Sequence, residues 1–125
     1  MKLETFNSLY EYRSEKGDRW RIPKIVNGKI LGDCEDYSLG VLYYVIAEFN
    51  IFKFWWLLLT SAKIHYVKND GGGHAVLKYK DQYIDNWTQE FVSKQHMESL
   101  GHKFHWAFYL TYQVAIKLLI GKVLK

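Results

Sequence analysis

The chain has little cysteine and little proline, with one residue of each among 125. A single cysteine excludes a disulfide within the chain. Because small secreted domains often carry several cysteines, the count favours a reducing compartment. The only proline, Pro23, lies in an irregular segment, and the sequence contains no repeat, low-complexity tract or linker. We therefore expect one globular domain of ordinary size.

Long apolar runs are also missing from the sequence. An unbroken apolar run such as Phe54–Leu59 is far shorter than the ~20 residues that span a bilayer. The segment Met1–Trp20 is charged throughout and has no apolar stretch of the kind found in signal peptides. We therefore expect a soluble protein located in the cytoplasm.

Neither sign of charge dominates the sequence. Lys and Arg number 17 against 13 Asp and Glu, which gives a formal net charge of +4. The excess is scattered along the chain and forms no basic run. Aromatic residues make up 18% of the chain, enough either for a ring-rich core or for stacking on single-stranded nucleic acid. We expect these aromatic residues to lie in the core and in the wall of a cleft, and we expect no nucleic-acid partner.

The hydrophobic pattern predicts one helix followed mainly by strands. The helix begins at Cys34, with Asp33 as its capping residue, and ends at Asn50. Gly40 inside it indicates close packing, and Gly17–Asp33 before it is predicted as loop. The later predictions are a buried central strand over Phe52–Thr60, strands over Ala62–Lys68, His74–Lys80 and Gln82–Trp87 with a reversal at Lys80–Asp81, a helix over Glu90–Leu100, a strand over Lys103–Leu110 and a tail helix from Thr111. This order of elements gives the fold class α+β.

Three residues of complementary chemistry follow one another along these predicted elements. Cys34 starts the helix, His74 opens one strand and Asp85 lies near the end of the next. A helix N-terminus lowers the pKa of a thiol, an imidazole accepts its proton, and a carboxylate orients the imidazole. A reversal at Lys80–Asp81 places His74 opposite Trp87 and brings Asp85 within side-chain reach on the same face.

The segments around these residues resemble a known family. They are Gly32–Tyr37, Gly73–Leu77 and Tyr83–Asn86, with Trp20 and Pro23 upstream. Over roughly residues 15 to 110, the chain resembles the bacterial transglutaminase-like cysteine proteinases, which are papain-like hydrolases of the transglutaminase-like superfamily. The resemblance implies a papain-like core in which the catalytic helix packs on an antiparallel sheet. It also implies Cys34 as nucleophile, His74 as base and Asp85 as orienting acid.

Three acidic residues flank the cysteine, and two interpretations of them stay open. Asp33, Glu35 and Asp36 match residues beside a required calcium ion in some periplasmic members of the family, so the resemblance makes calcium a candidate cofactor; no other cofactor is expected. The same residues are typical of a helix cap and its first turn. Carboxylates beside a thiol raise its pKa, so a bound cation or outward-pointing side chains must offset them.

The resemblance implies a cysteine peptidase-like hydrolase that cleaves a peptide or amide bond through an acyl-enzyme, with a protein or peptide as substrate. The expected oxyanion donor is the Cys34 amide. Two alternatives stay open. The first is an amidase or acyltransferase with the same triad, acting on cell-wall peptide or a glutamine amide, and the second is a binding protein with a vestigial triad. Small members of this kind occur in bacteriophages, which would place the protein in the host cytoplasm or a virion.

The chain continues beyond the region of resemblance. We predict a hydrolase domain over residues 1–110 and an amphipathic C-terminal helix over residues 111–125. The apolar side of this helix is predicted to consist of Phe108, Tyr112, Ala115, Leu119 and Val123, widened by Leu118 and Ile120. Such a face is buried on its own domain, or against a protein partner or a second copy. Attachment to a membrane surface is a third alternative.

Overall fold

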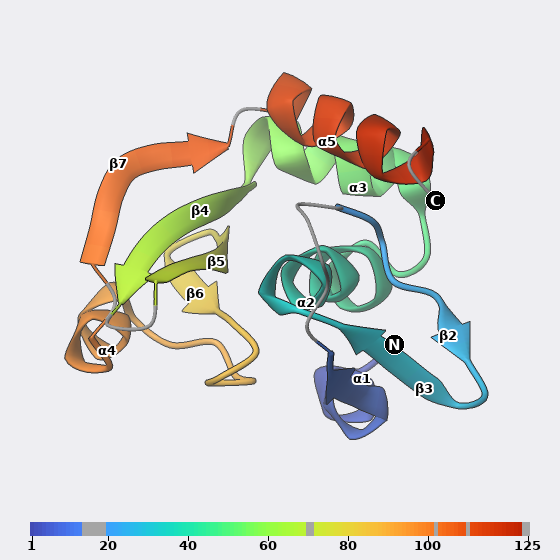
Figure 1. Ribbon diagram of the computed structural model, residues 1–125, viewed down its shortest axis with the longest axis horizontal. Coiled ribbons are helices and arrows are strands. Elements are labelled where there is room, and N and C mark those ends of the chain that lie inside the picture. The colour runs from blue at the N-terminus through green and yellow to red at the C-terminus, as the bar shows by residue number, and fades with distance from the viewer. Residues whose placement is uncertain (14–19, 70–71, 102, 110, 124–125) are drawn as a thin grey trace.

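The computed structural model describes residues 1–13, 20–69, 72–101, 103–109 and 111–123, and Figure 1 shows their arrangement. The elements in chain order are α1 (Leu3–Leu9), β1 (Tyr10–Tyr12), β2 (Ile25–Val26), β3 (Lys29–Gly32), α2 (Cys34–Gly40), the π-helical segment η1 (Val41–Ile46), α3 (Ile51–Thr60), β4 (Ala62–Asn69), β5 (Gly72–Tyr79), β6 (Gln82–Ile84), α4 (Lys94–Ser99), β7 (Lys103–Tyr109) and α5 (Thr111–Val123). Helices and two small sheets share the chain, which confirms the fold class α+β.

The two sheets lie on either side of the segment formed by α2 and η1 (Figure 1). In the smaller sheet the strand order is β1–β3–β2, and β1 runs parallel to β3. In the four-stranded sheet the order is β6–β5–β4–β7, and every neighbouring pair is antiparallel. Because α2 contacts both β3 and β5, the helix that begins at Cys34 is held between the two sheets.

The strands predicted in the second half of the chain are confirmed, with shifted ends. β4, β5 and β7 occupy the predicted segments, and the reversal lies at Lys80–Asp81 as expected; residue 110 is outside the described residues. β6 ends at Ile84, short of the predicted end at Trp87, because the Trp87 amide turns back onto the Asp85 carboxylate. The helix predicted over Glu90–Leu100 is confirmed as the shorter α4.

The strand predicted over Phe52–Thr60 is wrong, because this segment belongs to the helix α3. Asn50 caps it, and its side-chain oxygen accepts hydrogen bonds from two amides of the first turn, at 3.0 and 3.1 Å. The buried face consists of Phe54, Leu57 and Leu58, whereas Phe52, Trp56 and Leu59 are exposed. Because apolar residues occupy both faces, the continuous run concealed the helical period.

Two predictions for the first half of the chain also need correction. The segment predicted as loop holds β2 and β3, which pair as a hairpin around an Asn-Gly turn; residues 17–19 of that segment are outside the described residues. The helix predicted from Cys34 to Asn50 ends at Ile46, after the π-helical segment η1. Glu48 and Phe49 then take positive φ values of 52° and 65°, which no continuing helix allows.

Gly40 is a point of close packing, as its position inside a helix indicated. A Cβ atom at this residue would lie 2.7 Å from the Phe6 ring and 3.0 Å from Pro23. Phe6 is fully buried, and its ring contacts those of Tyr37 and Tyr44. Helix α1 therefore approaches the end of α2 so closely that only glycine fits between them.

Helix α5 lies along α3 (Figure 1) and contributes to the hydrophobic core. Val114 is fully buried, and Lys117 Nζ lies 5.1 Å from the centroid of the Trp20 ring. Two residues of the predicted apolar side are not covered by the rest of the chain, because Ala115 is exposed and Leu119 is 62% exposed. The side chains of Phe108, Tyr112 and Val123 are outside what the structure describes. Self-association through this helix and the domain boundary at residue 110 stay predictions.

None of the described helices is by itself long and apolar enough to cross a membrane. The segments Cys34–Ile46 and Ile51–Thr60 meet that requirement only when they are taken together, and the chain bends by 112° between them.

We predict that Val114→Ala lowers the free energy of unfolding by roughly 1–3 kcal/mol, because it leaves a cavity where α5 meets the core. The matched control is Leu119→Ala on the exposed side of the same helix, which we expect to change stability by less than about 0.5 kcal/mol. Urea denaturation followed by circular dichroism measures both. Equal losses in the two variants would show that α5 does not pack as described.

Candidate active site

The start of α2 fixes the backbone around Cys34. Asp33 Oδ1 accepts a hydrogen bond from the Asp36 amide, and Asp36 Oδ2 accepts one from the Asp33 amide, both at 3.3 Å. This reciprocal capping box satisfies two amide groups of the helix N-terminus. The Asp36 side chain occupies the space that a Cβ atom on Gly32 would need, so glycine is required there. Cys34 follows as the first helical residue and is half-buried.

The sulfur of Cys34 contacts the central part of the larger sheet. The amide of Ala75 on β5 donates a hydrogen bond to Cys34 Sγ at 3.4 Å. Ala75 directly follows His74, and consecutive Cα atoms are about 3.8 Å apart. The thiol therefore contacts the residue next to the histidine, although 41 positions separate Ala75 from Cys34 in the sequence.

His74 and Asp85 form a buried pair. His74 Nε2 lies 2.9 Å from Asp85 Oδ2, and the two side chains are 6% and 0% exposed. The other carboxylate oxygen, Oδ1, accepts hydrogen bonds from the amides of Trp87 at 3.1 Å and Thr88 at 2.8 Å. The turn after β6 therefore fixes the carboxylate, and the carboxylate fixes the imidazole. The contact that the strand register predicted is present.

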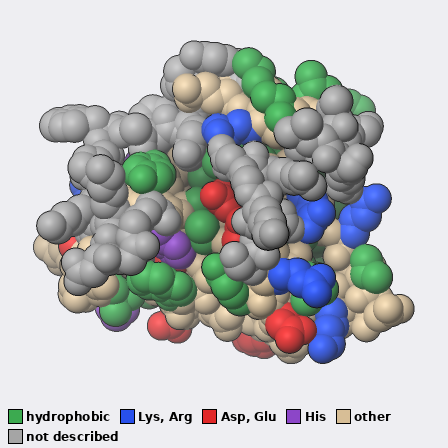
Figure 2. Space-filling view, viewed as in Figure 1, with side chains coloured by type: hydrophobic (Ala, Val, Ile, Leu, Met, Phe, Trp, Pro, Cys, Tyr) green, Lys and Arg blue, Asp and Glu red, His purple; other side chains and the backbone are tan. Residues whose placement is uncertain are grey.

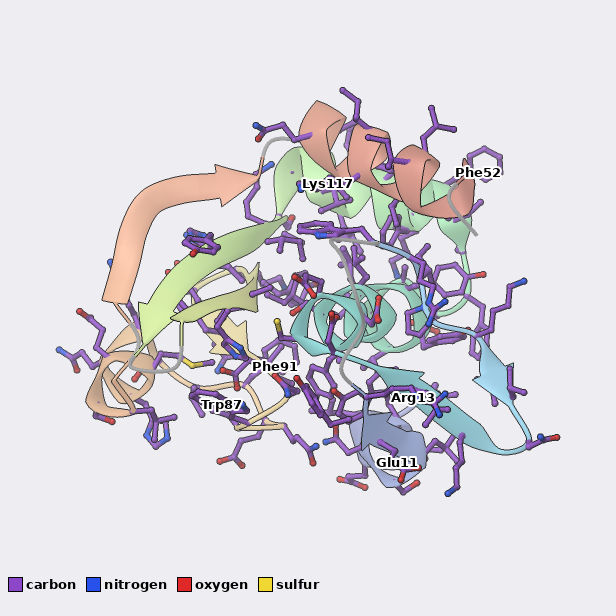
Figure 3. The ribbon with its side chains drawn as sticks, in the orientation of Figure 1. Glu11, Arg13, Phe52, Trp87, Phe91 and Lys117 are labelled. Carbon is purple, nitrogen blue, oxygen red and sulfur yellow. The ribbon has the colours of Figure 1, made fainter. Side chains whose placement is uncertain are left out.

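Trp87 has a role at this site that the sequence did not reveal. Its ring stacks on the His74 imidazole, with centroids 4.6 Å apart and an interplanar angle of 28°. The indole is 55% exposed whereas the histidine is 6% exposed, so Trp87 covers the imidazole from the solvent side. Figure 3 labels Trp87 beside the segment that follows β6. The strand register set by the reversal at Lys80–Asp81 placed Trp87 opposite His74. This was the only sequence signal for the contact between the two rings.

A second set of contacts missed by sequence reasoning holds the Asp85 turn. The Tyr37 hydroxyl on α2 donates to Asn7 Oδ1 at 2.6 Å, and Asn7 Nδ2 on α1 donates to the carbonyl of Gln89 at 2.7 Å. The Gln89 amide donates in turn to the Asp85 carbonyl at 2.9 Å. Helices α1 and α2 are thereby connected to the turn that carries Asp85. No local pattern signals such a contact between residues 82 positions apart.

The environment of Cys34 holds its thiol in the protonated form. Burial raises its pKa from the usual 9.0 to about 12, and the Glu35 and Asp33 carboxylates add to the rise. The hydrogen bond from the Ala75 amide lowers the pKa but does not reverse the shift. The helix N-terminus alone would lower the thiol pKa, so burial and like charge outweigh it here.

The contacts of Asp33 and Asp36 fit the capping interpretation. Asp33 and Asp36 face amide groups of their own helical turn, and Asp36 is fully buried. Among the described residues, no three His, Cys, Asp or Glu side chains come together as a metal site. Calcium beside Asp33, Glu35 and Asp36 stays a prediction, which a calcium titration of metal-free protein, read as melting temperature, would test.

Comparison with known proteins identifies no relative of this chain. No protein-family model, no curated protein and no solved structure matches it significantly. The residues of the site and their geometry are therefore the basis for any functional assignment.

We predict that Glu35→Gln lowers the pKa of the Cys34 thiol, because it removes the carboxylate that raises this pKa most. In the wild type, alkylation by iodoacetamide should rise about tenfold per pH unit through mildly alkaline pH and stay slower than that of a cysteine in a short peptide. In Glu35→Gln the rate at each pH should be higher. The control Glu48→Gln removes an exposed acid that pairs with Lys53, and it should leave the rate unchanged. Identical profiles for Glu35→Gln and the wild type would contradict the electrostatic account.

Proposed function

We propose that this chain is a cysteine hydrolase with a papain-like or transglutaminase-like core, which cleaves a peptide or amide bond through an acyl-enzyme. The observation that carries the proposal is the buried 2.9 Å contact between His74 Nε2 and Asp85 Oδ2, one residue along β5 from the amide that donates to Cys34 Sγ. Nucleophile, base and orienting acid also follow one another in the order of the family that the sequence resembles. A buried histidine–carboxylate pair next to the chain's one thiol suits nucleophilic catalysis.

The His74–Asp85 contact determines which ring nitrogen acts as the base. With Asp85 ionised, Nε2–H donates to Oδ2, and the lone pair is on Nδ1. Nδ1 accepts the thiol proton while Sγ attacks the carbonyl carbon of the substrate and the S–C bond forms. Because the thiol pKa is raised to about 12, the proton leaves during the attack. His74 therefore acts as a general base and not as the partner of a standing thiolate.

The remaining steps use the same groups. The carbonyl oxygen becomes an oxyanion, and the Cys34 amide is a suitable donor because the first amides of a helix have no acceptor within it. Collapse of the intermediate breaks the C–N bond, and the leaving amine takes the proton from Nδ1. Water then loses a proton to Nδ1 as it attacks the thioester, and that proton returns to the sulfur when the acid is released.

The acceptor of the acyl group distinguishes the enzymatic alternatives. An amidase and a peptidase both use water, whereas an acyltransferase uses an amine, and the triad is the same in all three. A single experiment separates them. The protein is incubated with peptide, cell-wall peptide and glutamine-amide substrates, with and without a primary amine, and the acyl-enzyme and products are identified by mass spectrometry.

We predict that Cys34→Ala and His74→Ala each abolish turnover. Cys34→Ala should leave the fold intact, whereas His74→Ala should also lower stability because the buried Asp85 carboxylate loses a partner. Asp85→Asn should lower turnover without abolishing it, because the imidazole remains. The loss arises because an asparagine amide donates to Nε2 and favours the tautomer with its proton on Nδ1, which cannot accept the thiol proton. The matched controls are His96→Ala on the exposed surface of α4 and Asp81→Asn in the exposed turn before β6. Both controls should keep wild-type rates.

The outcomes of this series separate the classes of function. Turnover by the Cys34→Ala protein at the wild-type rate would remove the cysteine mechanism. Absence of an acyl-enzyme with every substrate in the panel, in a protein that is folded, would favour the binding protein with a vestigial triad.

A further inference from the structure

The outer face of the small sheet forms a pocket of basic side chains. Its volume is about 250 Å³, and the described residues that line it are Arg13, Arg21, Lys24, Val26, Lys29 and Leu31. None of these is a residue of the proposed triad. Figure 2 shows Lys and Arg side chains gathered over the part of the face that β2 and β3 occupy.

The strand register explains why these residues share one face. Successive side chains on a strand point to opposite sides. Ile30 in β3 is fully buried in the core, so its neighbours Lys29 and Leu31 lie on the outer face. Val26 in β2 pairs with Lys29. The amide of Arg13 donates to the Gly32 carbonyl at 2.9 Å, which places Arg13 beside the end of β3.

Among the described residues that line this pocket, cationic side chains outnumber acidic ones. Four cationic side chains line the pocket, and none of its described lining residues is acidic. The neighbouring acid Glu11 lies 3.2 Å from Lys29 Nζ, and both side chains are more than half exposed. Figure 3 labels Glu11 and Arg13 near each other at this edge. Like charges that share a concave surface raise the local potential and attract an anion of higher charge.

We propose that this pocket binds a phosphate-bearing anion of the diphosphate or phosphate-monoester class. A phosphate group carries about −1.5 to −2 charge and several acceptor oxygens, which match more than one cation at once. The guanidinium of arginine binds phosphate in a bidentate manner. The volume fits an anionic head group, since pockets for whole drug-sized ligands are roughly 300–1,000 Å³. Val26 and Leu31 add an apolar wall for the carbon chain of an organic phosphate.

The test measures binding of inorganic diphosphate to the full chain by isothermal titration calorimetry. The double variant Arg13→Gln/Lys24→Gln changes two exposed cations of the pocket. We expect its affinity for diphosphate to fall at least about tenfold, because each charged hydrogen bond contributes that order of binding. The control Lys78→Gln/Lys80→Gln removes the same charge from a different surface region, near Thr60 and Asp81, and should bind like the wild type.

Vesicles of phosphatidylcholine with and without phosphatidic acid distinguish the source of the phosphate. Saturable diphosphate binding that the pocket variant loses indicates a free anion. Binding to phosphatidic acid vesicles alone, lost in the same variant, indicates a lipid head group. Absence of both, or equal losses in the pocket variant and the control, overturns the proposal. This test measures binding and the triad is tested by turnover. Failure of the anion proposal can therefore be distinguished from failure of the proposed hydrolase function.

Discussion

The burial of the Asp85 carboxylate is the constraint on which the rest of the site depends. A carboxylate with no exposure must have its oxygens paired, because removing an ion from water costs several kcal/mol. Oδ1 is satisfied by the amides of Trp87 and Thr88, and Oδ2 by His74. These contacts end β6, form the turn after it and orient the imidazole. The same turn places the Trp87 ring over His74, so one buried charge organises most of the site.

The position of Cys34 combines two opposing effects. Its place at the start of α2 gives it access to helix amides, but the burial that packs α2 against β5 also raises the thiol pKa. Glu35 and Asp33 add to the rise in the thiol pKa, although the capping box ties Asp33 and Asp36 to their own turn. A thiol in this environment stays protonated at rest, and as a nucleophile it would depend on a base to remove its proton. The arrangement therefore makes the histidine essential to the proposed chemistry.

The features that sequence reasoning predicted correctly have local causes. The cap at Asp33 depends on side-chain contacts within one helical turn, and the reversal at Lys80–Asp81 depends on alternation in the two strands that flank it. Once that reversal is fixed, the strand register brings His74 and Asp85 within reach of each other. The glycine in α2 was also informative, because only close packing favours glycine inside a helix. Local patterns and short-range geometry thus predicted which elements carry the candidate site residues and that His74 and Asp85 lie close together.

The sequence by itself determined the fold class, the cap before Cys34, the strand reversal and the chain order of the three candidate residues. Only the tertiary structure decided that the apolar run after Asn50 is a helix, because its neighbours cover one side of it and leave the other exposed. Likewise it buried Val114, and not Leu119, of the last helix. The raised pKa of the Cys34 thiol and the basic pocket are also determined by the tertiary structure. Burial and electrostatic potential are sums over residues that are distant in the chain, and no local pattern contains those sums.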